Sequence, residues 1–264
     1  MARSTLSSIR NAVLGVVATS ATLAGAAGCA PGNPGVVVLA SLAPNEQCVY
    51  DPAGIIFVTM PLMDLDPLVG SGGGLTELRP SYIAQLVVNN NIISRYSTSY
   101  PVQGNVSQWI ATGAEVELLD VRGARLPGGG FYRTRASGTI PAALGDQPGR
   151  GLVRVDVIPN SIATTVVEPF FVGSTEGQGL ITARITLIGQ TGGGTEVRAA
   201  PYIMPIDVCY GCLYQDGTLE VGQIPGCSPG QDTPYIISGY SRTPACIDSG
   251  ECASGACVLG RCVR

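Results

Sequence analysis

The sequence contains no histidine and no lysine, and all 15 of its basic residues are arginine. Without histidine there can be no Ser-His-Asp triad, no Cys-His pair and no histidine-ligated metal site. Without lysine there can be no P-loop, no Schiff base and no Ser-Lys dyad. Because these absences exclude most common catalytic centres, we expect a protein that is not an enzyme and needs no cofactor.

Charge is also scarce. Charged residues make up 13% of the chain, and the formal net charge is −4. A net acidic chain without a basic cluster is a poor partner for nucleic acids, because phosphate contacts supply most of that affinity. Hydrophobic residues nevertheless reach 45%, alongside 36 glycines and 19 prolines. The composition therefore indicates a folded, turn-rich chain rather than a disordered one.

The first 28 residues have the three-part pattern of a secretory signal peptide. Arg3 and Arg10 give a basic start without acidic residues, and Val13 to Ala27 is a run of mostly small apolar residues. A membrane-spanning helix needs about 20 strongly apolar residues, whereas short polar residues interrupt this run. We therefore expect residues 1–28 to direct export and then to be removed.

Two cleavage patterns overlap before the first cysteine. Ala24-Gly25-Ala26 fits ordinary secretion. Ala26-Ala27-Gly28-Cys29 resembles the lipobox of bacterial lipoproteins, although that family usually has leucine where this chain has Ala26. In such proteins the cysteine is lipidated on sulfur and becomes the new N-terminus, and Ala30 after it, rather than aspartate, would favour outer-membrane delivery.

The cysteine count favours the lipoprotein interpretation. The chain has nine cysteines, an odd number that leaves one thiol over in an exported protein. A thioether at Cys29 would leave eight, all of which can pair. We therefore expect fatty acyl chains such as palmitate on Cys29 to attach the protein to a membrane, since two or more chains give stable binding. Plain secretion, with Cys29 free or paired between chains, is the alternative.

After a lipidated tether and linker over 29–47, the main body reads with a period of two. Within the linker, 35–42 is a candidate first strand, and 64–80 is an expected loop with the run SGGG at 71–74. The other segments that we expect as strands are 55–60, 82–88, 114–121, 131–140, 152–158, 180–188 and 195–208.

This spacing predicts an all-β fold, an antiparallel immunoglobulin-like β-sandwich over residues 48–208, with one buried and one wet face on each strand. No helical period of useful length is present. Pro201 and Pro205 confine the last strand to an edge or break it. The alternative is two tandem immunoglobulin-like domains that divide near 141–151.

The segment 209–264 holds seven of the nine cysteines and few large apolar residues. A piece of this size cannot bury enough surface to fold on hydrophobicity alone, so we expect a small disulfide-stapled tail in an oxidising compartment. Four cysteines form a self-contained set with three possible connectivities, and four others remain to pair among themselves. The first set is Cys246, Cys252, Cys257 and Cys262; the second is Cys48, Cys209, Cys212 and Cys227.

The order of these features carries a resemblance. A lipobox-like leader precedes a cysteine, a β-body with the Gly-rich hairpin IGQTGGGTEV, the segment PIDVCYGCL, and a closing SGECASGACVLGRC. This arrangement resembles the cysteine-rich predicted surface lipoproteins of myxobacterial-type Gram-negative bacteria. The resemblance implies a lipid anchor in the outer membrane, periplasmic or surface-exposed, and implies no particular chemistry.

Two short patterns near polar residues could hold a metal. Cys209 and Cys212 form a C-x-x-C, which can serve redox chemistry or bind zinc. No helix start in a βαβ setting and no second ligand pair accompany it, so we expect structural disulfides and no metal. Asp64 and Asp66 could ligate calcium, but the EF-hand offsets are broken, and we expect solvated loop carboxylates.

Two further groups could bind or act on a ligand. Glu115 and Glu117 share one face of a strand and could form the carboxylate pair of a glycoside hydrolase, although that face should be the solvent face. Trp109, with Tyr96 and Tyr100 nearby, could stack on sugars, but we expect ordinary packing.

We therefore expect a lipid-anchored, non-enzymatic protein of the Gram-negative cell envelope with a structural or interaction role. Its partners would be the membrane, through lipid on Cys29, and an unidentified envelope protein or glycan, with no nucleic acid. The first alternative is a glycan- or small-ligand-binding module that uses the loops at one end of the sandwich. The second is a carboxylate-dependent hydrolase.

Overall fold

The computed structural model describes residues 35–45, 48–53, 57–66, 68–71, 74–77, 80–93, 106–174, 176, 178–216, 231–232, 235–237, 245–253 and 255–262. The expected signal peptide 1–28, the expected lipidation site Cys29 and Cys227 lie outside these residues. The account below concerns the described residues.

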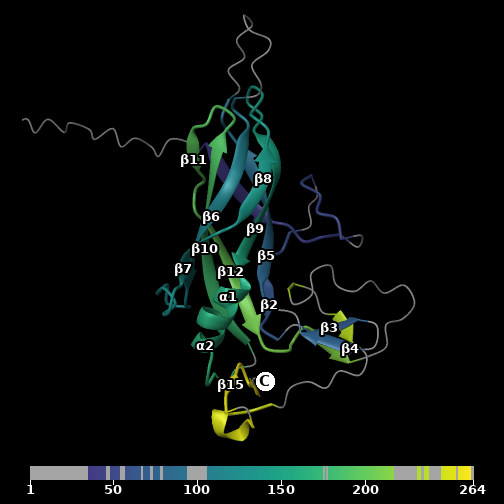
Figure 1. The fold of residues 1–264 in the computed structure, drawn as a ribbon. Helices are drawn as coiled ribbons and strands as arrows, with labels where there is room; N and C mark the ends of the chain where they lie inside the picture. The colour runs from purple at the N-terminus through teal and green to yellow at the C-terminus, as the bar shows by residue number, and fades with distance from the viewer. Residues whose placement is uncertain are drawn as a thin grey trace, which may run out of the picture. The chain divides into compact units, whose positions relative to one another are not determined.

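The body is one large curled sheet, and the expectation of an all-β fold is confirmed (Figure 1). The strands follow the order β1-β5-β9-β8-β6-β10-β12-β2, with β11 paired to β10 and β7 paired to β6. Neighbours are antiparallel except for β12 and β2, which are parallel. The strands are β1 Val36–Ser41, β2 Leu62–Asp64, β5 Tyr82–Asn90, β6 Trp109–Leu119, β7 Phe131–Thr134, β8 Ala136–Ile140, β9 Gly149–Ile158, β10 Gln178–Thr191, β11 Glu196–Arg198 and β12 Tyr202–Cys209.

Strand β8 joins the two halves of the sheet. Ser137 of β8 pairs with Arg154 of β9, while Trp109 of β6 pairs with Ile140 at the other end of β8. The single edge strand expected over 131–140 is therefore two strands, β7 and β8, which part at Arg135, and β8 lies in the interior of the sheet. The two layers expected of a sandwich are two halves of one continuous sheet.

The inner face of the sheet encloses a single apolar core. Alternate residues of β10 are fully buried, as the period of two predicts: Ile181, Ala183, Ile185 and Leu187. The buried residues of β5, β6, β9 and β12 belong to the same cluster. Because β5 pairs with β9 across the 141–151 region, the alternative of two tandem domains does not hold. Strand β1 lies within the expected linker 29–47 and is an integral strand of this sheet.

Two segments differ from the sequence interpretation. In the expected strand 55–60, the described part 57–60 contains only an isolated bridge from Phe57 to Leu42. Conversely, the expected loop 64–80 holds a hairpin of β3 Leu68–Ser71 and β4 Gly74–Glu77. Glycine-rich turns suit tight hairpins, so the SGGG run was consistent with a hairpin tip as well as with a loop.

A short helical segment that we did not predict follows β9. It consists of α1 Asn160–Ile162, the π-helical turn η1 Ala163–Val167 and α2 Glu168–Phe170. Ala163, Val166 and Val167 face the core. The segment is too short to show a helical period, and its threonines and valines favour strands. No helix among the described residues is long and apolar enough to span a bilayer.

The C-terminal region contains small paired elements: β13 Tyr214–Asp216 with β14 Tyr235–Ile237, and β15 Cys257–Val258 with β16 Arg261–Cys262, preceded by the 3₁₀ turn η2 Ser249–Glu251. Val258 and Leu259 are fully buried in the core of the body. The backbone N–H of Gly173 donates to the carbonyl of Cys257 at 2.6 Å, and that of Gly260 donates to Ser174 at 3.0 Å. The last hairpin therefore docks on the chain that follows α2.

Candidate functional site

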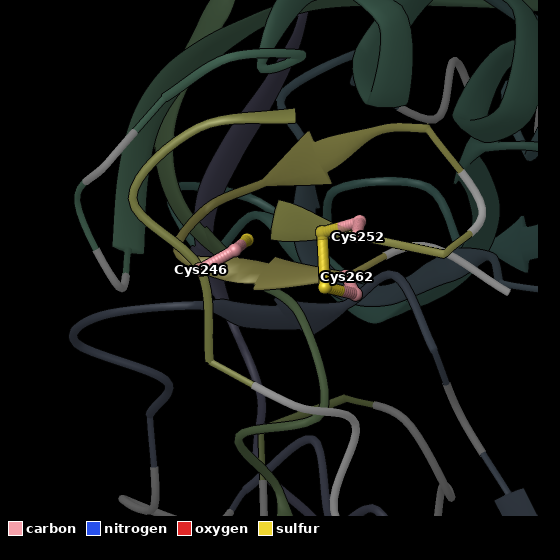
Figure 2. Close-up of side chains that lie close together, drawn as sticks. All are labelled: Cys246, Cys252 and Cys262. Atoms are coloured by element: carbon pink, nitrogen blue, oxygen red, sulfur yellow. A yellow bond between two sulfur atoms is a disulfide. The ribbon is translucent and has the colours of Figure 1, made fainter. Parts of the chain in front are cut away.

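All of the described cysteines are disulfide-bonded. Cys246 bonds to Cys257 and Cys252 bonds to Cys262, so the four form a self-contained unit, as expected. Figure 2 shows the Cys252–Cys262 bond with Cys246 beside it. Their buried sulfurs form a small cluster of their own.

The remaining cysteines differ in their pairing. Cys209 and Cys212 bond to each other, and Cys48 is also disulfide-bonded. Two groups of three side chains lie close enough to hold a metal ion: Cys246 with Cys252 and Cys262, and Asp64 with Cys209 and Cys212. Metals bind the thiolate form of cysteine, so oxidised sulfurs are poor ligands and neither group favours zinc.

Asp64 fastens the C-x-x-C turn to β2. Its carboxylate accepts hydrogen bonds from the backbone N–H groups of Gly211 at 2.7 Å, Leu213 at 3.0 Å and Asp66 at 2.9 Å. The residue is fully buried, and burial raises the pKa of its carboxyl group against the opposing effect of these donors. The expectation of solvated carboxylates at Asp64 and Asp66 was therefore wrong, since both residues are buried.

Glu115 is half-buried on the outer face of β6, where arginines pair with both glutamates, whereas the expectation of a solvent-facing side chain is wrong for Glu117, which is buried. Arg133 and Arg198 contact Glu115 at 2.8 and 2.9 Å, and hydrogen bonding from Arg133 holds the pKa of Glu115 below its usual range. Glu117 pairs with two further arginines of the same face, Arg125 and Arg184. A hydrolase needs one carboxyl group with a raised pKa as proton donor, and such ion pairs act in the opposite direction.

Trp109 fills the core. It is fully buried, and its Nε1 donates to the carbonyl of Val197 at 3.2 Å. The expectation of ordinary packing is confirmed, and this indole has no face to offer a sugar. Tyr96 and Tyr100 lie outside the described residues.

Gln231 links β5 to β2, two strands that lie far apart in the order of the sheet. Its side chain makes both hydrogen bonds that a neighbouring strand would make with Ile83 of β5: Nε2 donates to the carbonyl at 2.8 Å, and Oε1 accepts from the N–H at 2.9 Å. Its backbone forms a bridge to Met63 of β2. No sequence pattern points to this residue, because it lies in a glycine- and proline-rich stretch without periodicity.

Asp232 follows directly and points its carboxylate toward β2 and β5. The carboxylate accepts hydrogen bonds from the Leu62 N–H at 3.0 Å and from the Tyr82 hydroxyl, which lies 3.0 Å from each oxygen. Burial raises the pKa of the Asp232 carboxyl. Burial and the neighbouring Asp232 also raise the pKa of Tyr82, so this hydroxyl remains a hydrogen-bond donor at neutral pH.

A cavity of about 230 Å³ opens beside Asp232. The β1–β2 connection supplies most of its lining, which includes Tyr50, Phe57 and Met60, and Gln231 and Asp232 supply the rest. Phe57 is 46% exposed and Met60 is 62% exposed. The lining residues are Ala43, Pro44, Tyr50, Phe57, Val58, Thr59, Met60, Gln231 and Asp232. We call this cavity the Asp232 pocket.

The pocket is lined by apolar and aromatic side chains together with an acidic residue, Asp232, an arrangement suited to binding a small ligand. Comparison with protein-family models, with curated proteins and with solved structures gives no match.

Proposed function

We propose that the protein is an exported, lipid-anchored and non-enzymatic component of the Gram-negative cell envelope, with a structural or interaction role. The observation that carries this proposal is that all of the described cysteines are oxidised. Structural disulfides persist in oxidising compartments and are rare in the cytosol. The basic start, small apolar run and Cys29 of the N-terminal segment support export and lipidation.

Mass spectrometry of the N-terminus of the native protein tests the anchor. We expect an acylated peptide that begins at Cys29, and we expect Cys29→Ser to move the protein from the membrane fraction to the soluble fraction. An unmodified peptide that begins at Ala27 would overturn the lipid proposal and favour ordinary secretion. Ser8→Ala, a change of similar size outside the cleavage region, serves as the matched control and should leave fractionation unchanged.

Titration of thiols in the unfolded, unreduced protein tests the compartment. We expect no free sulfhydryl group in the mature chain from envelope fractions. Reduced cysteines at positions 246, 252, 257 and 262 in freshly isolated protein would contradict export.

Binding of a small ligand in the Asp232 pocket is the second candidate function. The open cavity, which Asp232 helps to line, supports it. The sugar-stacking version gains no support from Trp109, which is buried. A thermal-shift screen with neutral, anionic, cationic and saccharide compounds tests it, because a true pocket ligand should raise the Tm of the wild type more than that of Asp232→Asn. A screen in which every active compound stabilises both proteins equally would contradict this function.

A further inference from the structure

We propose that the Asp232 pocket binds a small organic cation whose charge is carried by a methylated ammonium group. This inference rests on the second candidate function above, ligand binding at the same pocket, and adds the chemical class of the ligand.

The negative charge of Asp232 favours a cationic ligand. The Asp232 carboxylate accepts hydrogen bonds from a backbone N–H and from the Tyr82 hydroxyl, and neither donor carries a positive charge. No arginine is among the described residues that line the pocket, and the chain has no lysine or histidine. Burying a carboxylate is costly unless a cation compensates it. A cationic ligand would supply the charge that the lining residues do not.

The carboxylates on the outer face of β6 have different partners from that of Asp232. There, each of Glu115 and Glu117 has two arginine partners although it lies on the outer surface of the sheet. Asp232 is more buried than Glu115, and among the described residues no arginine bears on its pKa. Arginines therefore compensate the charges of Glu115 and Glu117, whereas no described cation compensates that of Asp232.

The side chains that line the pocket also favour a cation. Tyr50 and Phe57 present aromatic rings and Met60 a thioether, and such soft, polarisable groups favour cations over neutral polar ligands. An ammonium group with free N–H bonds would need several acceptors, whereas the exposed wall side chains of Phe57 and Met60 offer a ring and a thioether. A methylated ammonium is a cation that needs no hydrogen-bond acceptors, because its charge is spread over methyl groups that pack against rings.

The size of the cavity and the rigidity of its walls fit a small ligand of this kind. A water molecule occupies about 30 Å³ in the liquid, so the cavity has room for about seven non-hydrogen atoms, the number in choline. Both sides are held by backbone bonds: the Val58 N–H donates to Ser41 at 2.9 Å, and the Asp232 N–H donates to Leu62 at 2.8 Å. Preorganised walls lower the entropic cost of binding.

Isothermal titration of the mature protein with choline chloride tests the proposal, with dimethylbutanol as the neutral control because carbon replaces the quaternary nitrogen. We expect saturable binding of choline and at least about tenfold weaker binding of dimethylbutanol, which corresponds to about 1.4 kcal/mol. Asp232→Asn should weaken choline by at least about tenfold, and asparagine tolerates the left-handed backbone found here, with φ of 62°. Asp146→Asn, at an exposed aspartate outside the pocket, should leave binding unchanged.

Equal binding of choline and dimethylbutanol would overturn the proposed ligand class and leave small-ligand binding intact. If neither binds, the inference falls; the thermal-shift screen then decides whether the pocket takes another ligand or none. Should Asp232→Asn fail to fold, Phe57→Ala replaces it, because this side chain is 46% exposed. A choline affinity unchanged in Phe57→Ala would also overturn the inference.

Discussion

The sheet and the C-terminal cystine unit (residues 245–262) exclude water by different means. The sheet buries large apolar side chains such as Trp109 and Leu118 in one continuous core. The cystine unit has a separate cluster of buried residues, and this cluster consists of four cysteines. Its two large buried apolar residues, Val258 and Leu259, belong to the core of the sheet instead.

This difference follows from size. A body of this length can bury enough apolar surface to offset its conformational entropy, whereas a segment of fewer than about 40 residues usually needs disulfides, metals or a partner. Two crossed disulfides constrain the unfolded tail, and Val258 and Leu259 attach it to the body. The two regions should therefore respond differently to the loss of apolar surface and to reduction.

The largest effect should come from the core of the sheet. Trp109→Ala removes a fully buried side chain together with its hydrogen bond to Val197, and should lower the free energy of unfolding by about 3–5 kcal/mol. The neighbouring Ile110→Ala, at a side chain 41% exposed, should change it by less than about 1 kcal/mol. Urea denaturation measures both. Similar losses for the two variants would mean that the sheet does not depend on its core in this way.

A somewhat smaller effect is expected where the two kinds of stabilisation meet, at Asp64. Asp64→Ala leaves the N–H groups of Gly211, Leu213 and Asp66 without their acceptor, and should destabilise the protein by about 3 kcal/mol. The same substitution at exposed Asp146 should be nearly neutral. A neutral Asp64→Ala, measured with disulfides intact, would show that the Cys209–Cys212 bond alone holds this turn.

Removal of one disulfide should act mainly on the tail. The double variant Cys252→Ala and Cys262→Ala opens a loop of 10 residues and should cost the tail about 2–3 kcal/mol of local stability. Hydrogen exchange should then show lost protection over 245–262 and retained protection in β5, β9 and β10. Equal loss in both regions would mean that they unfold as one unit.

The smallest effect is a pH dependence at Asp232. Burial raises the pKa of its carboxyl group above the ordinary value of 3.8, so the folded state holds the proton more tightly than the unfolded state. This contribution to stability is fully present below the ordinary pKa and is lost as pH rises through the folded value. Relative to Asp232→Asn, the wild type should therefore lose stability as pH rises above about 4. A constant difference from pH 3 to 7 would contradict the burial of this group.

The strands with the cleanest alternation could be predicted from sequence because period two is a local signal. Leu152 to Ile158 and Leu180 to Ile188 lie within β9 and β10, with the expected faces inward. The cysteine spacing likewise predicted the four-cysteine unit, but not which of its three connectivities forms, because that depends on the folded backbone.

The candidate site could not be predicted because its contacts are long-range. Gln231 and Asp232 reach Ile83 and Tyr82 across about 150 positions of sequence, and no local pattern marks them. The sequence predicts a solvated loop at Asp64 because the backbone N–H groups that donate to its carboxylate, those of Gly211 and Leu213, are equally far away along the chain. The segment 160–170 was missed because valine and threonine there favour strands, while the core packing of Val166 and Val167 decides for a helix.

The contact between Gln231 and Ile83 has a consequence for how the chain is made. Gln231 bonds to the part of β5 that β1 does not cover, and it follows β12 in the sequence. While the chain is being made, this part of β5 therefore stays without that partner until residue 231 has been added. Open strands pair readily with other chains, so truncation just before residue 231 should yield a sticky, self-associating product rather than a merely shorter protein.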